Sequence, residues 1–367
     1  MESEIDIKYM ARAIELARKG VGHVNPNPPV GAVIVKNGKI IGEGYHQAYG
    51  GPHAEINAIN HASGDISGST LYVTLEPCNH HGKTPPCTER IISENIKQVV
   101  IGIRDPNKRV AGGGIEKLES AGIVVKQDIL RDEVSTLNEF FIKYSETGLP
   151  FCTLKTAMSL DGKLATYTGD SKWITDDTSR QLVHTFRHTF AAILTGVNTI
   201  INDNPLLNDR SGITPESHPI KIIVDSTGRT PLNSALLNDT ARKTILAVTE
   251  KAPHLFRDAI TKLGGEIVVC PEIEGRVDLT FLMRHLGNAG IDSVMIEAGG
   301  ALNFSALQQG IVDKVLAFIA PKFLGGANAK TAVDGNGFVS VVEAKELIFK
   351  KVRLLNNDLL IEAYIKK

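Results

Sequence analysis

The chain has 367 residues, of which 42% are hydrophobic and 22% charged, and its formal net charge is −1. These values are typical of a globular protein, and the length predicts two domains because one hydrophobic core rarely serves so many residues. The sequence contains no dense block of Lys and Arg, which argues against a protein that holds nucleic acid mainly by its phosphates. The first ten residues, MESEIDIKYM, are acidic and no long apolar run follows them, so we expect neither a secretory signal nor a membrane span.

Only four cysteines occur, at positions 78, 87, 152 and 270. Cys152 and Cys270 stand alone in apolar runs, so we expect them to be buried and to behave as small hydrophobic residues. So few cysteines favour a reducing cytoplasmic environment over a framework of disulfides.

The first half of the chain alternates between helical and extended patterns. Apolar residues recur at helical spacing from Asp6 to Lys19, and two glycines then end the run. Asn37 and Gly38 lie between two β-rich runs and predict a tight hairpin. The remaining predicted elements are a helix at 53–62, a strand at 69–75, a helix at 87–96, and strands at 98–103 and 123–127. This alternation predicts an α/β domain.

A domain boundary is expected near Thr147–Phe151, where a helical run from Val134 to Ser145 ends in Gly and Pro and a new strand begins. We therefore predict domains at residues 1–147 and 148–367. The second half again alternates, which predicts an α/β fold rich in parallel strands. Its predicted strands are 151–157, 191–197, 220–226, 243–249, 266–270, 293–299, 314–321 and 358–365, and its predicted helices are 179–189, 259–264, 279–290 and 301–310.

One constellation in the first half predicts a metal site. The triplet HAE occupies 53–55, and PCNHHGKTPPC runs from Pro77 to Cys87. His53, Cys78 and Cys87 can fill three of the four tetrahedral positions of zinc and leave the fourth for water, as in catalytic zinc sites. Their expected places at or near the starts of two helices favour the thiolate form that zinc requires. H-x-E followed by P-C…C is the motif of zinc-dependent base deaminases, although eight residues here separate two cysteines that are usually spaced as C-x-x-C.

Glu55 is the spare carboxylate that hydrolytic deamination needs for moving protons. The alternative is a closed structural zinc site, for which His80 or His81 would supply the fourth ligand and Glu55 would be a solvated surface residue. The catalytic interpretation is favoured because a structural site needs no acid beside its histidine.

The two zinc motifs, with NPNPPVGAVIV at 25–35 and RDPNKRVAGGG at 104–114, resemble the bifunctional deaminase–reductase family of riboflavin biosynthesis. The resemblance continues through LKTAMSLDGKLAT, GDSKWIT, ILTGVNTIINDNP, IEAGG and APKFLGG, and so covers nearly the whole chain. It implies a cytidine-deaminase-like N-terminal domain, a dihydrofolate-reductase-like C-terminal domain and a homo-oligomer.

The implied reactions are two. The first is zinc-dependent hydrolytic deamination of 2,5-diamino-6-ribosylamino-4(3H)-pyrimidinone 5′-phosphate. The second is NADPH-dependent reduction of the ribosyl side chain to ribityl. In the first domain, Asn25, His46 and Lys83 match family positions that line the substrate pocket. Alternatively, Asn25 belongs to an ordinary turn, His46 is a satisfied polar residue and Lys83 is a solvated loop charge.

The second half lacks the G-x-G-x-x-G fingerprint, so its residues alone indicate a cofactor only weakly. Gly299 and Gly300 stand between a strand and a helix, where backbone N–H groups could approach a phosphate. Alternatively, the two glycines only allow the strand and the helix to pack closely. By matching positions, the resemblance implies that NADPH contacts Ala157, Trp173, Thr199, Asp203, Ser226 and the segment Gly299–Ser305. In the same way it implies that the substrate contacts Lys155, Ser171, Arg187, Leu207, Arg210 and Glu297.

Several of these assignments have simpler alternatives. Trp173, the only tryptophan, could be a packing residue, and Arg187 could be a surface charge on its helix. Lys155, Asp203 and Glu297 are unranked candidates for placing the proton of the reduction. Asn208 departs from the family pattern, where we expect Thr. For the whole chain, the alternatives are a nucleic-acid base deaminase with a non-catalytic C-terminal half, a zinc-stabilised binding module, and a family member that has lost one activity.

Overall fold

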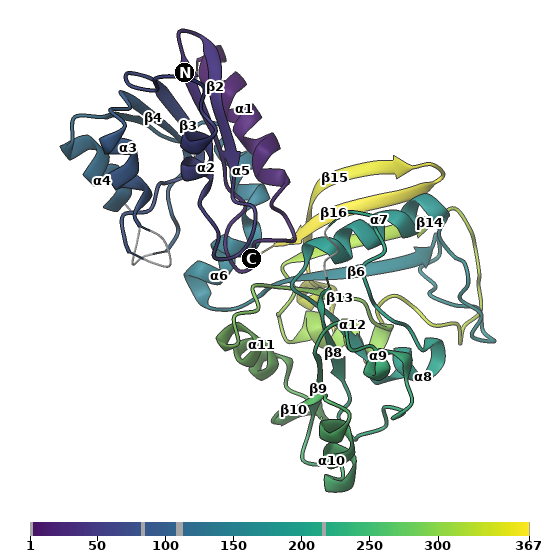
Figure 1. The fold of residues 1–367 in the computed structure, drawn as a ribbon. Coiled ribbons are helices and arrows are strands. Elements are labelled where there is room, and N and C mark those ends of the chain that lie inside the picture. Colours follow the sequence, from purple (N-terminus) through teal and green to yellow (C-terminus); the bar gives the residue numbers. More distant parts are fainter. Residues whose placement is uncertain (1–2, 82–84, 108–112, 215–217, 367) are drawn as a thin grey trace. The chain divides into compact units, whose positions relative to one another are not determined.

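The computed structural model describes residues 3–81, 85–107, 113–214 and 218–366 (Figure 1). The chain divides into two compact units, Met1–Gly148 and Leu149–Lys367, and each is described by itself. Within the described ranges, every helix is too short or too polar to cross a membrane.

The first unit is built on a five-stranded sheet in the order β2-β1-β3-β4-β5. The strands β2, β1 and β3 pair antiparallel, and β3, β4 and β5 pair parallel. Asn37 and Gly38 both have positive φ, 52° and 73°, which confirms the predicted hairpin between β1 and β2. The strands are β1 (Gly31–Lys36), β2 (Lys39–Tyr45), β3 (Thr70–Leu75), β4 (Gln98–Ile103) and β5 (Val124–Lys126).

Helices cover both faces of this sheet. A Cβ on Gly31 would lie 2.0 Å from the backbone oxygen of Ala13, so α1 packs directly against β1. A Cβ on Gly44 would lie 2.3 Å from the backbone nitrogen of Ala58, so α2 packs against β2 from the other face, because cross-strand partners Ala32 and Gly44 share a face. The helices are α1 (Glu4–Arg18), α2 (Ala54–Asn60), α3 (Cys87–Ser93), α4 (Gly113–Ser120), α5 (Arg131–Leu137) and α6 (Glu139–Thr147).

One helix predicted from the sequence is in fact two. The expected run from Val134 to Ser145 breaks at Asn138, whose φ of −104° and ψ of 16° leave the helical region. The Asn138 side chain donates to the carbonyl oxygen of Val134 at 3.1 Å and is buried. A side-chain bond of this kind competes with the helical ladder, which explains the break.

The second unit is built on a nine-stranded sheet in the order β10-β9-β8-β7-β13-β6-β14-β16-β15. All neighbours from β10 to β14 pair parallel, which confirms the parallel-rich prediction, and β14, β16 and β15 pair antiparallel. The strands of this sheet are β6 (Phe151–Ser159), β7 (Ala192–Gly196), β8 (Ile220–Val224), β9 (Thr244–Val248), β10 (Glu266–Val269), β13 (Ser293–Ile296), β14 (Lys314–Ala320), β15 (Leu347–Leu355) and β16 (Asp358–Ile365).

A two-stranded ribbon, six α-helices and one short 3-10 helix, Val341–Glu343, complete the described part of this unit. The ribbon consists of β11 (Glu272–Ile273) and β12 (Arg276–Val277). The helices are α7 (Asp177–Thr189), α8 (Val197–Asp203), α9 (Ala235–Asn238), α10 (His254–Lys262), α11 (Leu279–Asn288) and α12 (Gly300–Gln308), of which α9 is a single turn. The short helices α8 and α9, the ribbon and β15 were not predicted from the sequence.

The core of each unit lies between its sheet and helices. Ile193, Leu194 and Ile222 on the central strands of the second sheet are fully buried. Burial of one such side chain contributes about 1.5–3 kcal/mol. Cys152 and Cys270 lie in this core as free thiols, which confirms their prediction as small buried residues.

Candidate functional sites

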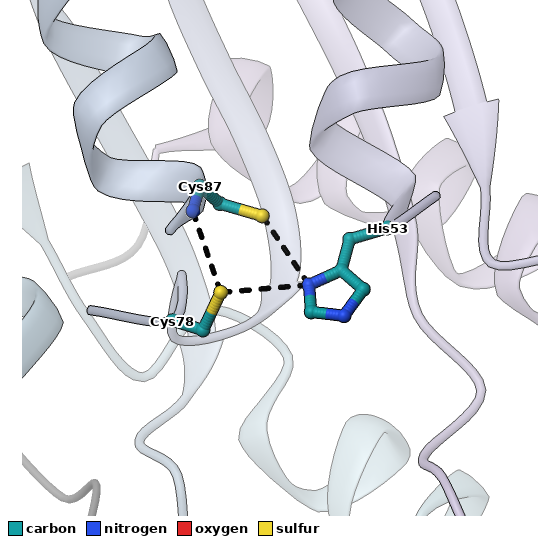
Figure 2. Close-up of side chains that lie close together, drawn as sticks. All are labelled: His53, Cys78 and Cys87. Carbon is teal, nitrogen blue, oxygen red and sulfur yellow. Dashed lines mark hydrogen bonds between the residues drawn. The ribbon is translucent and has the colours of Figure 1, made fainter. Parts of the chain in front are cut away.

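The zinc motif converges at one end of the first sheet. His53 immediately precedes α2, Cys87 is the first residue of α3, and Cys78 follows β3 in the intervening loop. Figure 2 shows the imidazole and both sulfur atoms turned toward one another from two neighbouring helix starts. His53 Nδ1 lies 3.5 Å from Cys78 Sγ and 3.3 Å from Cys87 Sγ.

These spacings fit tetrahedral zinc. With a Zn–S distance of about 2.3 Å and a Zn–N distance of about 2.0 Å, the ligand atoms of such a site are about 3.5 Å apart. All three candidate ligand atoms lie within 4.8 Å of one another. The geometry therefore provides a three-ligand site of the kind that leaves one position for water.

The protonation of the two thiols also suits a divalent cation. The hydrogen bond with Cys87, with help from His53, lowers the pKa of the Cys78 thiol to about 4. Its hydrogen bond to Cys78, together with burial, raises the pKa of the Cys87 thiol. One proton is thus held between the two sulfur atoms, of which that of Cys87 is buried, and a cation that replaces it allows both to be thiolates.

Glu55 is buried, with 3% of its surface exposed, so the alternative of a solvated surface residue is wrong. Burial raises the pKa of its carboxyl group, and the nearby charge of His53 partly opposes that shift. A carboxyl group with a raised pKa, two residues after a zinc histidine, is suited to accept and return a proton near neutral pH.

The alternative of a closed structural site lacks its fourth ligand. Within the described residues, the group of possible ligands around His53 contains Cys78 and Cys87 and no other histidine, cysteine or acid. His80 and His81 are both exposed in the loop.

A buried carboxylate that we did not single out from the sequence holds the loop of Cys78 in place. Glu76 directly follows β3, two residues before Cys78, and is 3% exposed. It accepts hydrogen bonds from the backbone N–H groups of Asp105 at 3.1 Å, Gly114 at 3.1 Å and Ile115 at 3.2 Å. Two of these donors belong to the first turn of α4, where a negative charge is stabilising. The sequence signal that could have identified Glu76 was its position directly before the P-C motif.

Of the residues predicted to line the deaminase pocket, the structure describes His46 and Asn25 but not Lys83. The His46 ring packs edge-on against His53, with ring centres 5.5 Å apart, and its two nitrogens contact the Asn27 amide at 3.2 Å and the Pro52 carbonyl at 3.0 Å. Burial lowers the pKa of His46. Asn25 lies in the same connection before β1, joined to Pro26 by a cis peptide bond. Lys83 lies outside the described residues.

The second unit contains a cavity of about 1970 Å³ at the carboxyl ends of its parallel strands. This is the edge where ligands bind in open α/β sheets, and the volume exceeds that of most single-ligand pockets, about 300–1,000 Å³. The reductase residues predicted by resemblance all line it: Lys155, Ala157, Ser171, Trp173, Arg187, Thr199, Asp203, Leu207, Arg210, Ser226, Glu297, Gly299 and Gly300.

A buried ion cluster forms one wall of this cavity. Arg187 of α7 donates two hydrogen bonds to Glu297, 2.7 Å from Nε to Oε1 and 2.9 Å from Nη2 to Oε2. Lys155 Nζ of β6 lies 3.3 Å from Glu297 Oε2. Burial by itself would raise the pKa of Glu297, but the charges of Arg187 and Lys155 lower it to about 2. Arg187 is therefore a buried partner of Glu297 and not a surface charge, with 13% of its side chain exposed.

A second pair, which we did not single out from the sequence, supports the loop that carries Leu207 and Arg210. His188 Nδ1 lies 2.8 Å from Asp209 Oδ2, and both side chains are almost fully buried. The Arg187 guanidinium also donates to the carbonyl of Asn208, at 3.4 Å. Two consecutive residues of α7 thus hold one loop at the cavity, and Leu207 in it adopts a positive φ of 51°.

The two glycines before α12 differ in their surroundings. A Cβ on Gly300 would lie 2.4 Å from the backbone oxygen of Thr331, so Gly300 permits close packing. A Cβ on Gly299 would meet no atom within 4 Å, so its backbone faces open space in the cavity, as a backbone that cradles a cofactor must. Trp173 is 64% exposed and lies against the Arg180 guanidinium, which excludes a role in core packing.

Comparisons with known protein families agree with the two sites. The model of the cytidine and deoxycytidylate deaminase zinc-binding region matches residues 3–103. The model of the RibD C-terminal domain matches residues 150–361.

Individual relatives match over nearly the full chain. The riboflavin biosynthesis protein RibD of Actinobacillus pleuropneumoniae is 45% identical over 97% of this chain and 94% of its own length. That of Escherichia coli K12 is 39% identical over 96% and 97%. Among solved structures, RibD of Acinetobacter baumannii superposes with a TM-score of 0.89 at 36% identity and covers both chains completely. A Thermotoga maritima diaminohydroxyphosphoribosylaminopyrimidine deaminase/5-amino-6-(5-phosphoribosylamino)uracil reductase superposes with a TM-score of 0.88 at 38% identity over 99% of both chains.

The fold and the two sites define a bifunctional enzyme, in which a cytidine-deaminase-like zinc unit precedes a dihydrofolate-reductase-like unit that uses NADPH. The chain belongs to the RibD family of riboflavin biosynthesis proteins. The alternative of a nucleic-acid base deaminase with a non-catalytic second half is not favoured, because that half matches the family's reductase domain.

Proposed function

We propose that His53, Cys78 and Cys87 hold the zinc ion of the deaminase and that Glu55 moves its protons. The proposal rests on one observation above the others, the three ligand atoms within 4.8 Å of one another beside a buried carboxyl group. Zinc, when bound, lowers the pKa of its water and so supplies hydroxide at neutral pH.

In this proposal the substrate is 2,5-diamino-6-ribosylamino-4(3H)-pyrimidinone 5′-phosphate, and its 2-amino group is hydrolysed. Glu55 accepts the proton of the attacking water and delivers protons to the ring nitrogen and to the departing amine. Ammonia leaves and a ring carbonyl remains. His46, packed against His53, together with Asn25 and Lys83 binds the substrate, and Asn27 orients the His46 ring through its amide contact.

The cavity of the second unit is proposed to bind NADPH and the deaminated product together. Ala157, Trp173, Thr199, Asp203, Ser226, Gly299 and Gly300 contact NADPH, which supplies the hydride. Arg210, together with Ser171 and Leu207, binds the phosphorylated product, and Arg187 acts mainly by holding Glu297, because two of its N–H groups are already engaged there.

The proton of the reduction is assigned to Lys155. Glu297 keeps its carboxylate ionised far below neutral pH and has no proton to give. The Lys155 ammonium, 3.3 Å from that carboxylate, is a charged donor in the same wall of the cavity. Asp203 is exposed at the end of α8 and is a weaker candidate.

We test the deaminase assignment with Glu55→Gln in the full-length, zinc-loaded protein. The variant should keep its zinc, because Glu55 is not a ligand, and should lose ammonia release by at least about 10²-fold, because the proton carrier is gone. Its NADPH-dependent reduction of supplied deaminated product should be unchanged. Ammonia release within a few fold of the wild type would remove Glu55 from the mechanism.

We further propose that the protein acts in the cytoplasm as a homo-oligomer. Four free cysteines are compatible with a reducing compartment. The exposed apolar edge strand β15 supports association.

A further inference from the structure

One end of the cavity in the second unit carries two arginines. Thr227 and Arg229 follow β8, and Arg276 opens β12 of the two-stranded ribbon; all three line the cavity. The backbone N–H of Val277 donates to Ser226 Oγ at 3.2 Å and thereby fixes the ribbon beside the end of β8.

This end is remote from the ion cluster that surrounds Glu297. The strand order is β8-β7-β13-β6, and neighbouring strands are about 4.8 Å apart. The end of β8 therefore lies about 10 Å from β13, which Glu297 follows, and about 14 Å from β6, which carries Lys155. If the hydride is transferred beside Lys155 and Glu297, as proposed above, the adenosine half of an extended dinucleotide lies at the β8 end.

Each of the two guanidinium groups is held by hydrogen bonding to a neighbouring helix. Arg276 Nη1 donates to the Ala301 carbonyl at 3.2 Å and to Ser305 Oγ at 3.1 Å, in α12. Arg229 Nη2 donates to Asn198 Oδ1 at 3.0 Å, in the first turn of α8. Each anchor uses one nitrogen of a guanidinium that has five N–H donors, so most donors remain for a ligand.

On the segments that carry Arg229 and Arg276, the charged residues that line the cavity are all basic. Among the described residues, the acidic ones that line the cavity are Asp177, Asp203, Glu297 and Asp334, and none belongs to the segments that carry Arg229 and Arg276. Sites for NADH place an acid on the ribose 2′-hydroxyl, whereas sites for NADPH place an arginine near the 2′-phosphate.

We propose that Arg229 and Arg276 bind the 2′-phosphate of the adenosine ribose and so make the reductase specific for NADPH over NADH. The hydroxyl of Thr227 completes the set of donors around the phosphate. The inference rests on the proposed cofactor site and adds to it the residues that distinguish the two cofactors.

The test is direct binding to the full-length protein by isothermal titration calorimetry, with NADPH, NADH, 2′,5′-ADP and 5′-AMP as ligands. Arg276→Ala and Arg229→Ala should each raise the Kd for NADPH and 2′,5′-ADP roughly tenfold or more, because a charge-assisted contact to phosphate is lost. The Kd for NADH and 5′-AMP should stay within about twofold. Arg242→Ala is the matched control, since it removes an exposed arginine of the same unit that does not line the cavity.

The outcomes separate the inference from the proposal on which it rests. An equal loss of NADPH and NADH affinity in the arginine variants, or no loss of either, would overturn the assignment of the 2′-phosphate. Wild-type protein that binds neither NADPH nor NADH would instead overturn the cofactor site itself.

Discussion

At the residue scale, two buried glutamates show how neighbours decide the state of the same side chain. Glu55 and Glu297 are 3% and 8% exposed. Burial raises the pKa of Glu55, which has only a partly opposing histidine nearby. The pKa of Glu297 falls to about 2 because two cations face it. One carboxyl group is therefore suited to carry protons and the other to hold a fixed negative charge.

The Glu297 cluster predicts an acid dependence of stability. Its folded pKa of about 2 lies below the value of about 4.3 for an unfolded glutamate, so the folded state binds the proton more weakly. The cluster should stabilise the second unit fully above about pH 4.5, and that contribution should be lost as the pH falls towards 2. We expect a loss of a few kcal/mol, measured by urea unfolding at each pH with the fluorescence of Trp173, the only tryptophan and a reporter for this unit.

Glu297→Gln is the control for that experiment. It removes the titrating group but leaves Arg187 and Lys155 without their anion, so the unit should be less stable at pH 7 and its stability should change less between pH 4.5 and 2. Parallel pH profiles for the wild type and this variant would contradict the assigned role of Glu297.

At the scale of elements, α7 links the ion cluster to the substrate loop. Arg187 bonds to Glu297, which follows β13, and His188 bonds to Asp209 in the loop of Arg210. Neighbouring residues of one helix therefore hold both the end of β13 and this loop. Asp209 also accepts a hydrogen bond from the backbone N–H of Ser211 at 2.8 Å, which closes the loop after Arg210. The position of Arg210 therefore depends on a buried pair that does not itself line the cavity.

We predict that Asp209→Asn raises the reductase KM for its phosphorylated substrate about tenfold with a smaller change in kcat. The expected cost in stability is about 1–3 kcal/mol, because the bond from His188 is weakened in a buried setting. Steady-state kinetics with saturating NADPH provide the measurement, and ammonia release by the same protein is the internal control.

Arg210→Ala serves as the comparison. It should raise the same KM without the loss of stability, since Arg210 is exposed. If Asp209→Asn lowered stability but left the KM unchanged, the pair would support the fold without positioning the loop.

The sequence was sufficient for elements with strong local patterns. The Asn37-Gly38 hairpin and the strands of both sheets up to β14 were predicted because turn residues and buried apolar runs are local features. The strand β15 was missed because its apolar residues are interrupted by Lys350, Lys351 and Arg353, and most of them are exposed at a sheet edge.

For the sites, the zinc ligands were predictable because their residue types and spacing are chemically restrictive. The roles of Glu76, His188 and Asp209 were not, since a single polar residue gives no signal until the fold supplies its partner. Arg187 shows the same limit: the resemblance implied a contact with substrate, whereas the structure places its guanidinium against a carboxylate 110 residues away.

At the scale of the whole molecule, the second sheet ends in a strand, β15, whose outer edge is unpaired within the described residues. Ile348, Phe349 and Leu354 of β15 are 56%, 64% and 72% exposed, and the strand pairs with β16 on one side only. Unpaired backbone groups beside exposed apolar side chains favour association, although Lys350, Lys351 and Arg353 lie in the same strand.

We therefore predict that light scattering of the purified protein gives the mass of at least two chains. Phe349→Asp should shift the distribution to single chains while both activities remain measurable, because β15 contributes no residue to either site. A wild-type protein with the mass of one chain would exclude this surface as a self-association site.

The arrangement of sulfur atoms in the first unit has a consequence for handling the protein. Cys152 and Cys270 are buried in the second unit, so only Cys78, which is partly accessible, is open to oxidants. Its sulfur lies within 4.8 Å of that of Cys87, close enough for a small movement to join them. Metal loss in air therefore exposes the deaminase to a disulfide that blocks reloading, whereas the reductase unit has no comparable weakness among its cysteines. Preparations stored without a thiol reductant would lose the first activity and retain the second.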